Sequence, residues 1–225
     1  MKDFKNIRNF IFDLDGTLYG QDMLEKVFGQ VSKRMGKFIS QKLNVDLKKA
    51  KELQTNYFHK YNTSLNGLMI HHNIDPLEFL KYVHEINLDF LKKDVVLREE
   101  LLKLDAKKYI YTNGSVAHIK QIIKSLGIED LFDGTFDIVD ANYVPKPSVE
   151  PCKAMVKKFN IDPKEAVFIE DIAINLEPAK KLGMKTVWVE NSEYWGKKNS
   201  NKDFIDLKIK NLSSFLKEIN ILKVA

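Results

Sequence analysis

The sequence predicts an α/β protein with a three-layer, doubly wound parallel sheet and an all-helical insertion after its first strand. Short apolar runs, separated by helical patterns of about ten residues, follow one another from residue 94 onward. Strands that alternate with helices in this way build a parallel sheet with helices on both faces. The insertion is indicated because residues 21–93 show only helical periodicity.

The first strand is the apolar run IRNFIFD, which ends at Asp13. Parallel strands need a crossover, and the first crossover here is much longer than one helix. We therefore expect residues 19–93 to form a helical cap above the carboxyl edge of the sheet, with residues 1–18 and 94–225 as the core domain. The helical patterns of the cap are DMLEKVFGQVSKRMGKFISQKL, DLKKAKELQTNYFHKY, LNGLMIHH and DPLEFLKYVHEI.

Strands and helices alternate over the rest of the chain. The predicted strands are KKYIYT, FDIVD, AVFIE and KTVWV. The predicted helices are HIKQIIKSLG, SVEPCKAMVKKF, INLEPAKKLG and a closing NLSSFLKEI. Gly127 fits a helix C-terminus, and Ser148 and Asp75 fit N-caps, with Pro76 and Glu78 at favourable positions of the first turn. Residues 191–203 are polar enough to form a surface loop.

Composition excludes several classes of protein. The 225 residues are 44% hydrophobic and 30% charged, which favours a packed core over disorder. The formal net charge is +5, but Lys and Arg are spread along helical faces, so we expect no nucleic-acid partner. The single Cys152 excludes an internal disulfide and has core spacing with Met155. With neither a signal-peptide pattern nor a membrane-spanning run, we expect a cytoplasmic protein without a membrane partner.

Polar residues follow four of the predicted strands at their carboxyl ends. Asp13 and Asp15 follow the first strand, and Thr112-Asn113-Gly114 follows the second. Lys146 lies after the third strand, and Glu170-Asp171 follows the fourth. Ligands of open parallel sheets bind at these ends, so the sequence predicts one site formed by all four segments.

These side chains suit phosphoryl transfer from a phosphate ester. Asp13 can attack phosphorus and form an aspartyl phosphate, which divides a difficult displacement into two easier steps. Asp15 can donate a proton to the leaving alcohol and then accept one from water. Thr112 and the backbone N–H groups that follow it, starting with Asn113, can hold phosphoryl oxygens, and Lys146 can neutralise their charge.

A phosphate dianion beside carboxylates requires a bridging cation. Mg²⁺ prefers oxygen ligands and needs only one or two carboxylates besides phosphate. The candidate ligands are Asp13, Asp171 and the backbone carbonyl of Asp15. Taken singly, each segment also has a structural explanation: Asp13-x-Asp15-Gly fits a turn with a helix cap, Lys146 a surface lysine, and Glu170-Asp171 a helix start. Their occurrence in order, each at a strand end, favours the site.

The chain resembles the haloacid dehalogenase superfamily of aspartate-nucleophile phosphatases, which have a Rossmann-like core. FDLDGTLY, YTNG, the lysine of VPKPS and IEDIAINLEPAKKLGM match its four motifs, and the insertion resembles its C1-type cap. Longer stretches, including SLNGLMIHHNIDPLEFLKYVHEINL and YTNGSVAHIKQIIKSLGIEDLFDG, resemble the pyrimidine 5′-nucleotidase branch. The resemblance implies Mg²⁺-dependent hydrolysis of UMP or CMP, with Asp13 as nucleophile, Asp15 as acid and base, Thr112 and Lys146 on phosphate, and Asp171 on the metal.

Two positions depart from that branch. Gly16 stands where Asn is common, and Ile172 where a small polar residue is common, so we expect Asn175 to replace a hydrogen bond near the metal. In the cap, Tyr61, Asn66 and His71 are candidate substrate contacts, because aromatic and amide side chains can stack on or bind a base.

Three other functions stay open at this stage. The four motifs also fit a phosphatase or phosphomutase for another small metabolite, such as a sugar phosphate or phosphoglycolate. A haloalkanoate dehalogenase is disfavoured because it leaves Asp15, Thr17 and Asp171 without a role. A non-catalytic binding module would show loss of catalytic residues, and none is lost here. The partner is therefore expected to be a small phosphate ester, and the protein a monomer or a homodimer.

Overall fold

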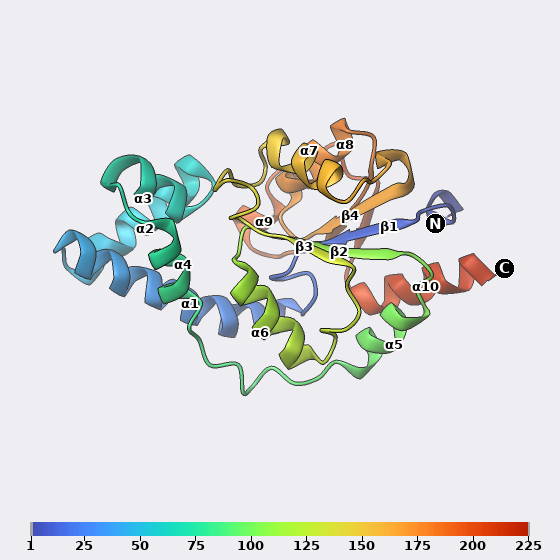
Figure 1. Cartoon of the computed structure of the whole chain (residues 1–225), viewed down its shortest axis with the longest axis horizontal. Helices are drawn as coiled ribbons and strands as arrows, with labels where there is room; N and C mark the ends of the chain where they lie inside the picture. The colour runs from blue at the N-terminus through green and yellow to red at the C-terminus, as the bar shows by residue number, and fades with distance from the viewer. Residues whose placement is uncertain (1, 225) are drawn as a thin grey trace.

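A six-stranded sheet forms the centre of the computed structural model, which describes residues 2–224 (Figure 1). The strands are β1 (Asn9–Phe12), β2 (Lys107–Tyr111), β3 (Gly134–Phe136), β4 (Ala166–Glu170), β5 (Lys185–Val189) and β6 (Leu207–Ile209). Their spatial order is β3-β2-β1-β4-β5-β6, and all neighbouring strands are parallel. The predicted α/β doubly wound fold is confirmed.

Both faces of the sheet are buried, which is why its strands are apolar runs. Along β1, Phe10 and Phe12 pack into one hydrophobic cluster and Ile11 into another, as the two-residue period of a strand requires. The first cluster includes side chains from α5 (Val95–Lys103), α6 (Val116–Leu126) and α10 (Leu212–Val224). The second includes α7 (Val149–Lys158), η3 (Ala173–Leu176) and α8 (Glu177–Lys181). Cys152 and Met155 are buried there, as predicted.

Four helices follow the first strand and lie at one end of the molecule in Figure 1. They are α1 (Gln21–Leu43), α2 (Leu47–Tyr61), α3 (Ser64–His72) and α4 (Pro76–Val83). Side chains such as Phe38, Leu68 and Phe79 give them a hydrophobic cluster of their own, whereas Leu24 and Val27, early in α1, belong to a cluster of the sheet. The division of the chain into core and cap at residues 19 and 93 stays a prediction.

Several helix ends have the predicted chemistry. The Asp75 carboxylate accepts a hydrogen bond from the Leu77 N–H (3.0 Å), and Gly127 ends α6 in the left-handed conformation with φ +70°. Ser148 precedes α7 without a side-chain cap bond. Glu78 pairs with Lys42 (2.7 Å), an ion pair that joins α4 to α1. Two short 3₁₀ helices are η1 (Lys2–Phe4) and η2 (Pro163–Glu165).

Two predicted segments differ from the structure. FDIVD was expected as a strand, but the strand ends at Phe136 because the Asp137 carboxylate accepts hydrogen bonds from the N–H groups of Val139 (3.0 Å) and Asp140 (2.9 Å). These bonds close a turn, so the strand prediction is wrong beyond Phe136. The predicted loop at 191–203 contains a short helix, α9 (Tyr194–Lys197).

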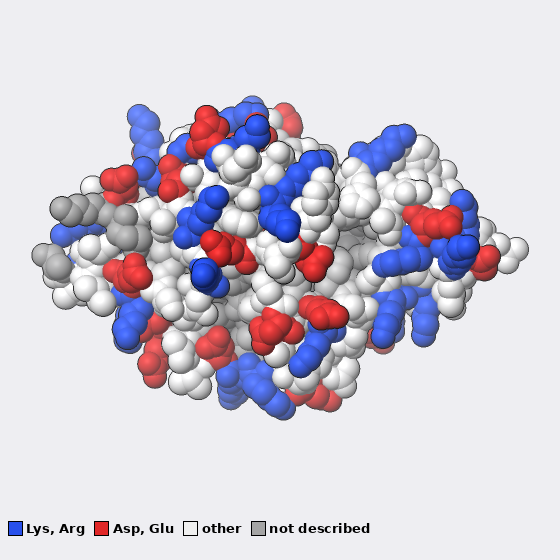
Figure 2. All heavy atoms as spheres, turned by 180° about the vertical axis from the view of Figure 1, so that it is seen from behind, with Lys and Arg blue, Asp and Glu red and all other residues white. Residues whose placement is uncertain are grey.

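The surface carries both signs of charge. Figure 2 shows Lys and Arg interspersed with Asp and Glu over the face that it displays. Within residues 2–224, no helix has the length and apolar content that crossing a membrane requires.

Candidate active site

The polar groups gather where the order of the strands reverses. β1 lies between β2 and β4, so the chain winds outward on one side of β1 and then returns to its other side. Asp13 directly follows β1, and its N–H donates to the Ile169 carbonyl of β4 (2.9 Å). This hydrogen bond places Asp13 beside Glu170 and Asp171, at the position where open α/β sheets bind ligands.

Lys146 is the cation of this site. Its Nζ lies 2.6 Å from Asp13 Oδ1 and 2.6 Å from Glu170 Oε2, and donates to the Tyr111 carbonyl at 3.0 Å. The lysine is only 3% exposed. Burial opposes its charge, but Asp13 and Glu170 outweigh burial and raise the pKa of Lys146 above its ordinary value. Asn113 Oδ1 accepts from the Lys146 backbone N–H (2.9 Å) and so fixes the segment that carries the lysine.

Three buried carboxylates lie together at this ammonium group, which contacts two of them, Asp13 and Glu170. Oxygens of Asp13, Glu170 and Asp171 lie within 4.8 Å of one another. Burial, with the charge of Glu170 added, raises the pKa of Asp13 to about 8, and burial with Glu170 and Asp13 raises the pKa of Asp171 well above its ordinary value. The cluster thus has more acidic groups than Lys146 can neutralise. Carboxylate oxygens are ligands that Mg²⁺ prefers, so the donor set fits this cation.

The surroundings of Gly16 explain why a glycine follows the two aspartates. A Cβ at this position would lie 2.3 Å from Asp171 Oδ2, and the backbone has φ +81°. Only glycine allows both the left-handed turn and the close approach of the first loop to Asp171. The turn that the sequence suggested as an alternative is therefore present, and it brings the two loops together.

Asp171 is held by groups that the sequence did not indicate. Asn191 Nδ2 donates to Asp171 Oδ2 at 2.7 Å, and Gln21 Nε2 donates to the same oxygen at 3.2 Å. Asn175, which was predicted to take this role, is buried in η3, and within residues 2–224 its side chain makes no hydrogen bond to Asp171. The role of Asn175 near the metal stays a prediction, whereas Asn191 reaches Asp171 from the loop after β5 because that strand lies next to β4.

Asp15 lies in a hydrogen-bond environment of its own. Its carboxylate accepts from the Tyr19 hydroxyl and from His118 Nε2 (2.8 Å). Burial favours the neutral acid, but His118 and Tyr19 outweigh burial and hold the pKa of Asp15 below its ordinary value. Sequence reasoning missed His118. The available signal was a polar residue in the apolar pattern of its helix, where it is 1% exposed beside the fully buried Ile119 and Ile122.

Thr112 and Asn113 lie directly after β2, beside this cluster. Thr112 is buried, and its Oγ accepts from the Gly114 N–H (3.0 Å), which leaves the hydroxyl proton to be donated. The Asn113 side chain is engaged with the Lys146 backbone, and the role of Asn113 in phosphate binding stays a prediction.

Known proteins that resemble this chain identify its family. The family described as haloacid dehalogenase-like hydrolases matches residues 7–183, which is most of the chain. The chain belongs to the haloacid dehalogenase-like hydrolases. It is 30% identical over 93% of its length to the yeast "Phosphate metabolism protein 8", of which it covers 70%. It is 27% identical over 94% of its length to the "Glyceraldehyde 3-phosphate phosphatase" of Pyrococcus furiosus, of which it covers 92%.

Solved structures show the same fold. The crystal structure of a "HAD phosphatase from Thermococcus onnurineus" has a TM-score of 0.61 and 20% identity, covering 95% of this chain and 98% of the other. Family membership identifies an HAD-like hydrolase, and this likeness shows its fold.

The predicted substrate contacts of this HAD-like hydrolase lie on α2 and α3. The Tyr61 hydroxyl contacts His71 Nε2, the Tyr57 hydroxyl lies 2.7 Å from His72 Nε2, and Asn66 Nδ2 donates to the Tyr61 carbonyl at 3.1 Å. These cap residues are thus bonded to one another. Among the described residues, no hydrogen bond joins them to the carboxylate cluster, so their role in substrate binding stays a prediction.

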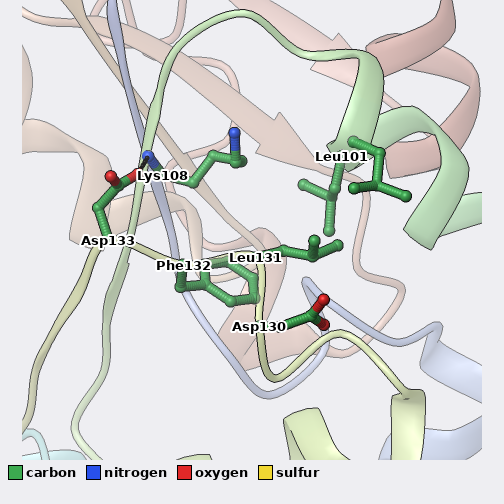
Figure 3. A pocket seen from close by; sticks show the side chains of 7 residues that line it. Leu101, Lys108, Asp130, Leu131, Phe132 and Asp133 are labelled. Atoms are coloured by element: carbon green, nitrogen blue, oxygen red, sulfur yellow. Dashed lines mark hydrogen bonds between the residues drawn. The ribbon is translucent and has the colours of Figure 1, made fainter.

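A hollow in the surface of the hydrolase lies at the start of β2, at the end of that strand opposite to Thr112 (Figure 3). It has a volume of about 240 Å³ and is lined by Leu101, Leu102, Lys108, Asp130, Leu131, Phe132 and Asp133. Its charged groups are already satisfied. Lys108 Nζ donates to two backbone carbonyls, Asp133 accepts from Lys107 (2.7 Å), and Asp130 pairs with Arg98. Both carboxylates of the hollow are therefore paired with cations, and its ammonium group is bonded to the backbone.

We expect the stability of this hydrolase to depend on pH through His84. Its ring stacks on His118 with centroids 4.5 Å apart, and burial together with His118 lowers the pKa of His84 to about 3. Because the unfolded chain binds this proton near pH 6.5, stability should fall as the pH falls from about 6.5 toward 3. The ring is partly exposed, so we expect a loss of about 1 kcal/mol at about pH 5.

Urea unfolding of wild type and His84→Phe at neutral pH and at about pH 5 measures this effect. Phenylalanine keeps a ring against His118 but does not titrate. The variant should lose about 1 kcal/mol less than wild type on acidification. Identical losses in the two proteins would show that His84 does not contribute.

Proposed function

We propose that this chain is a Mg²⁺-dependent phosphomonoesterase that forms an aspartyl phosphate on Asp13. The observation that carries the proposal is the contact of Lys146 Nζ with Asp13 Oδ1 (2.6 Å) inside the buried carboxylate cluster. A lysine paired with Asp13 and Glu170 holds the nucleophile in one orientation and offers positive charge to an incoming phosphoryl group. Asp15, held apart from this pair by other donors, is available to move protons.

The proposed reaction has two displacements at phosphorus. In the first, a carboxylate oxygen of Asp13 bonds to phosphorus, the ester P–O bond breaks, and Asp15, in its protonated form, gives its proton to the departing alkoxide. In the second, Asp15 takes a proton from water while the water oxygen bonds to phosphorus and the Asp13–phosphate bond breaks. Inorganic phosphate leaves, and both aspartates return to their starting states.

Backbone and side-chain groups hold the phosphoryl oxygens in this scheme. The Thr112 hydroxyl and the Asn113 N–H donate to them, and Lys146 offsets the charge that develops on them. Asp13, Asp171 and the backbone carbonyl of Asp15 would hold Mg²⁺, which supplies positive charge between the carboxylates and the phosphate dianion.

For the substrate, we propose a pyrimidine nucleoside 5′-monophosphate, UMP or CMP. The resemblance to pyrimidine 5′-nucleotidases supports it, because the resemblance extends through the predicted cap, where Tyr61, Asn66 and His71 are the proposed base contacts. A second candidate is a triose phosphate. It is favoured by the similarity to the glyceraldehyde 3-phosphate phosphatases of two Pyrococcus species.

A phosphate-release assay tests the function and separates the substrates. The panel is UMP, CMP, dUMP, AMP, glyceraldehyde 3-phosphate and phosphoglycolate at fixed Mg²⁺, with a parallel series in EDTA. We expect release only with Mg²⁺, and kcat/KM at least about 10-fold higher for UMP or CMP than for AMP. A higher value for glyceraldehyde 3-phosphate would select the second candidate. No Mg²⁺-dependent release from any ester, p-nitrophenyl phosphate included, would refute the phosphatase proposal.

A further inference from the structure

We propose that His118 is a positioning residue that orients the Asp15 carboxyl group for proton transfer to the leaving group. The inference rests on the proposed function, in which Asp15 is the acid. His118 comes from α6, more than a hundred residues along the chain from Asp15, and reaches it with a buried ring.

Two donors converge on one oxygen of Asp15. The Tyr19 hydroxyl donates to Oδ1, and His118 Nε2 lies 2.8 Å from Oδ1 and 3.2 Å from Oδ2. Both donors therefore hold the carboxyl group through Oδ1, which fixes the orientation of the whole group. Without the His118 contact, Tyr19 alone restrains the carboxyl group.

The surroundings of His118 fix which of its nitrogens donates. Gln121 Nε2 lies 2.7 Å from the His84 carbonyl and 3.2 Å from His118 Nδ1, so its two N–H groups have two acceptors. With Nδ1 accepting from Gln121, a neutral His118 carries its hydrogen on Nε2, which points it at Asp15. Gln121 is one turn along α6 from His118, so the same helix supplies both parts of the arrangement.

The ring of His118 is also held in place on its face. The His84 ring stacks on it, with 15° between the planes, and His84 Nδ1 lies 2.9 Å from Ser115 Oγ. Ser115 is the N-cap of α6 and accepts from the His118 N–H. Because His84 directly follows α4, the insertion contributes to the surroundings of the acid. All of these contacts orient a single N–H group toward Asp15.

The test compares two esters that differ in their need for an acid. An alkyl phosphate leaves as a strongly basic alkoxide and requires a proton, whereas p-nitrophenolate leaves without one. We would measure kcat/KM, which reports the first displacement, for p-nitrophenyl phosphate and for UMP or glyceraldehyde 3-phosphate, whichever wild type hydrolyses. The variants are His118→Leu, which removes the donor, and His118→Gln, whose Nε2 can replace it.

We expect His118→Leu to lower kcat/KM about 10- to 100-fold for the alkyl ester and less than about 3-fold for the aryl ester. His118→Gln should restore most of the loss. Because both esters are assayed on one preparation, their ratio does not depend on the folded fraction. His59→Leu removes an exposed histidine and should leave the ratio unchanged.

Equal losses on both esters, or no loss on either, would overturn the assignment, as would a Gln variant that behaves like Leu. Wild type without Mg²⁺-dependent release from either ester would instead contradict the proposed function, so the two failures are distinguishable.

Discussion

Asp13→Asn should abolish turnover, lowering kcat by more than about 10⁴-fold for every ester. The amide is nearly isosteric with the carboxylate but is a poor nucleophile, so no covalent intermediate should form. The amide oxygen can still accept from Lys146 Nζ, which also keeps Glu170 at 2.6 Å, so the fold should persist. Phosphate release and acid-quenched labelling of the protein measure the two parts of this result.

Asp22→Asn is the matched control, because it makes the same substitution at an exposed position in the first turn of α1. It should retain wild-type turnover and labelling. Substantial turnover by Asp13→Asn, with thermal unfolding unchanged, would show that another group attacks phosphorus.

Lys146→Met should lower kcat/KM by at least about 10³-fold and also destabilise the fold. Methionine fills a similar volume but leaves the carboxylates of Asp13 and Glu170 buried without their cation. Breaking a buried ion pair in this way costs about 3–5 kcal/mol at neutral pH. Loss of the lysine raises the carboxyl pKa values further, so the folded variant binds more protons than the unfolded chain, and the deficit should shrink as the pH falls.

Lys158→Met provides the contrast for this experiment. Lys158 also pairs with an aspartate at 2.7 Å, but its side chain is 43% exposed, against 3% for Lys146. Its removal should cost less than about 1 kcal/mol and leave kcat/KM unchanged. Urea unfolding at two pH values tests both variants. A similar cost for the two lysines would show that Lys146 does not neutralise a buried cluster.

The sequence was sufficient for β1, β2, β4 and β5 and for the identity of the polar residues at their carboxyl ends, but it did not indicate β6. Strands buried on both faces, such as AVFIE, are apolar runs whatever their neighbours, and the polar residue after each run marks where the strand ends. Parallel strands bring those ends to one edge. Asp13, Lys146 and Asp171 are therefore together in the structure although they are far apart in the chain.

The sequence did not show how the site is supported. Asn191 reaches Asp171 only because β5 lies beside β4, and His118 reaches Asp15 only because α6 packs under that loop. Long-range contacts of this kind leave no short-range pattern. The early end of the third strand was also not predicted. The Asp137 carboxylate accepts hydrogen bonds from the backbone N–H groups two and three residues further along, and the resulting turn replaces the strand.

The charge of the cluster links its stability to its function. A buried set of three carboxylates and one ammonium has an excess of negative charge, which is costly to remove from water. Burial raises the pKa values of Asp13 and Asp171, which expresses this excess of negative charge. A divalent cation would offset this excess of negative charge.

The most direct test of the central proposal is to locate the covalent phosphate. Wild-type protein would be mixed with labelled substrate and Mg²⁺, quenched in acid within one turnover, digested and mapped. We expect the label on the peptide that contains FDLDGTLYG, attached to Asp13 and absent from the Asp13→Asn variant. Label on any other residue, or turnover with none on the protein at any quench time, would contradict the aspartyl-phosphate mechanism.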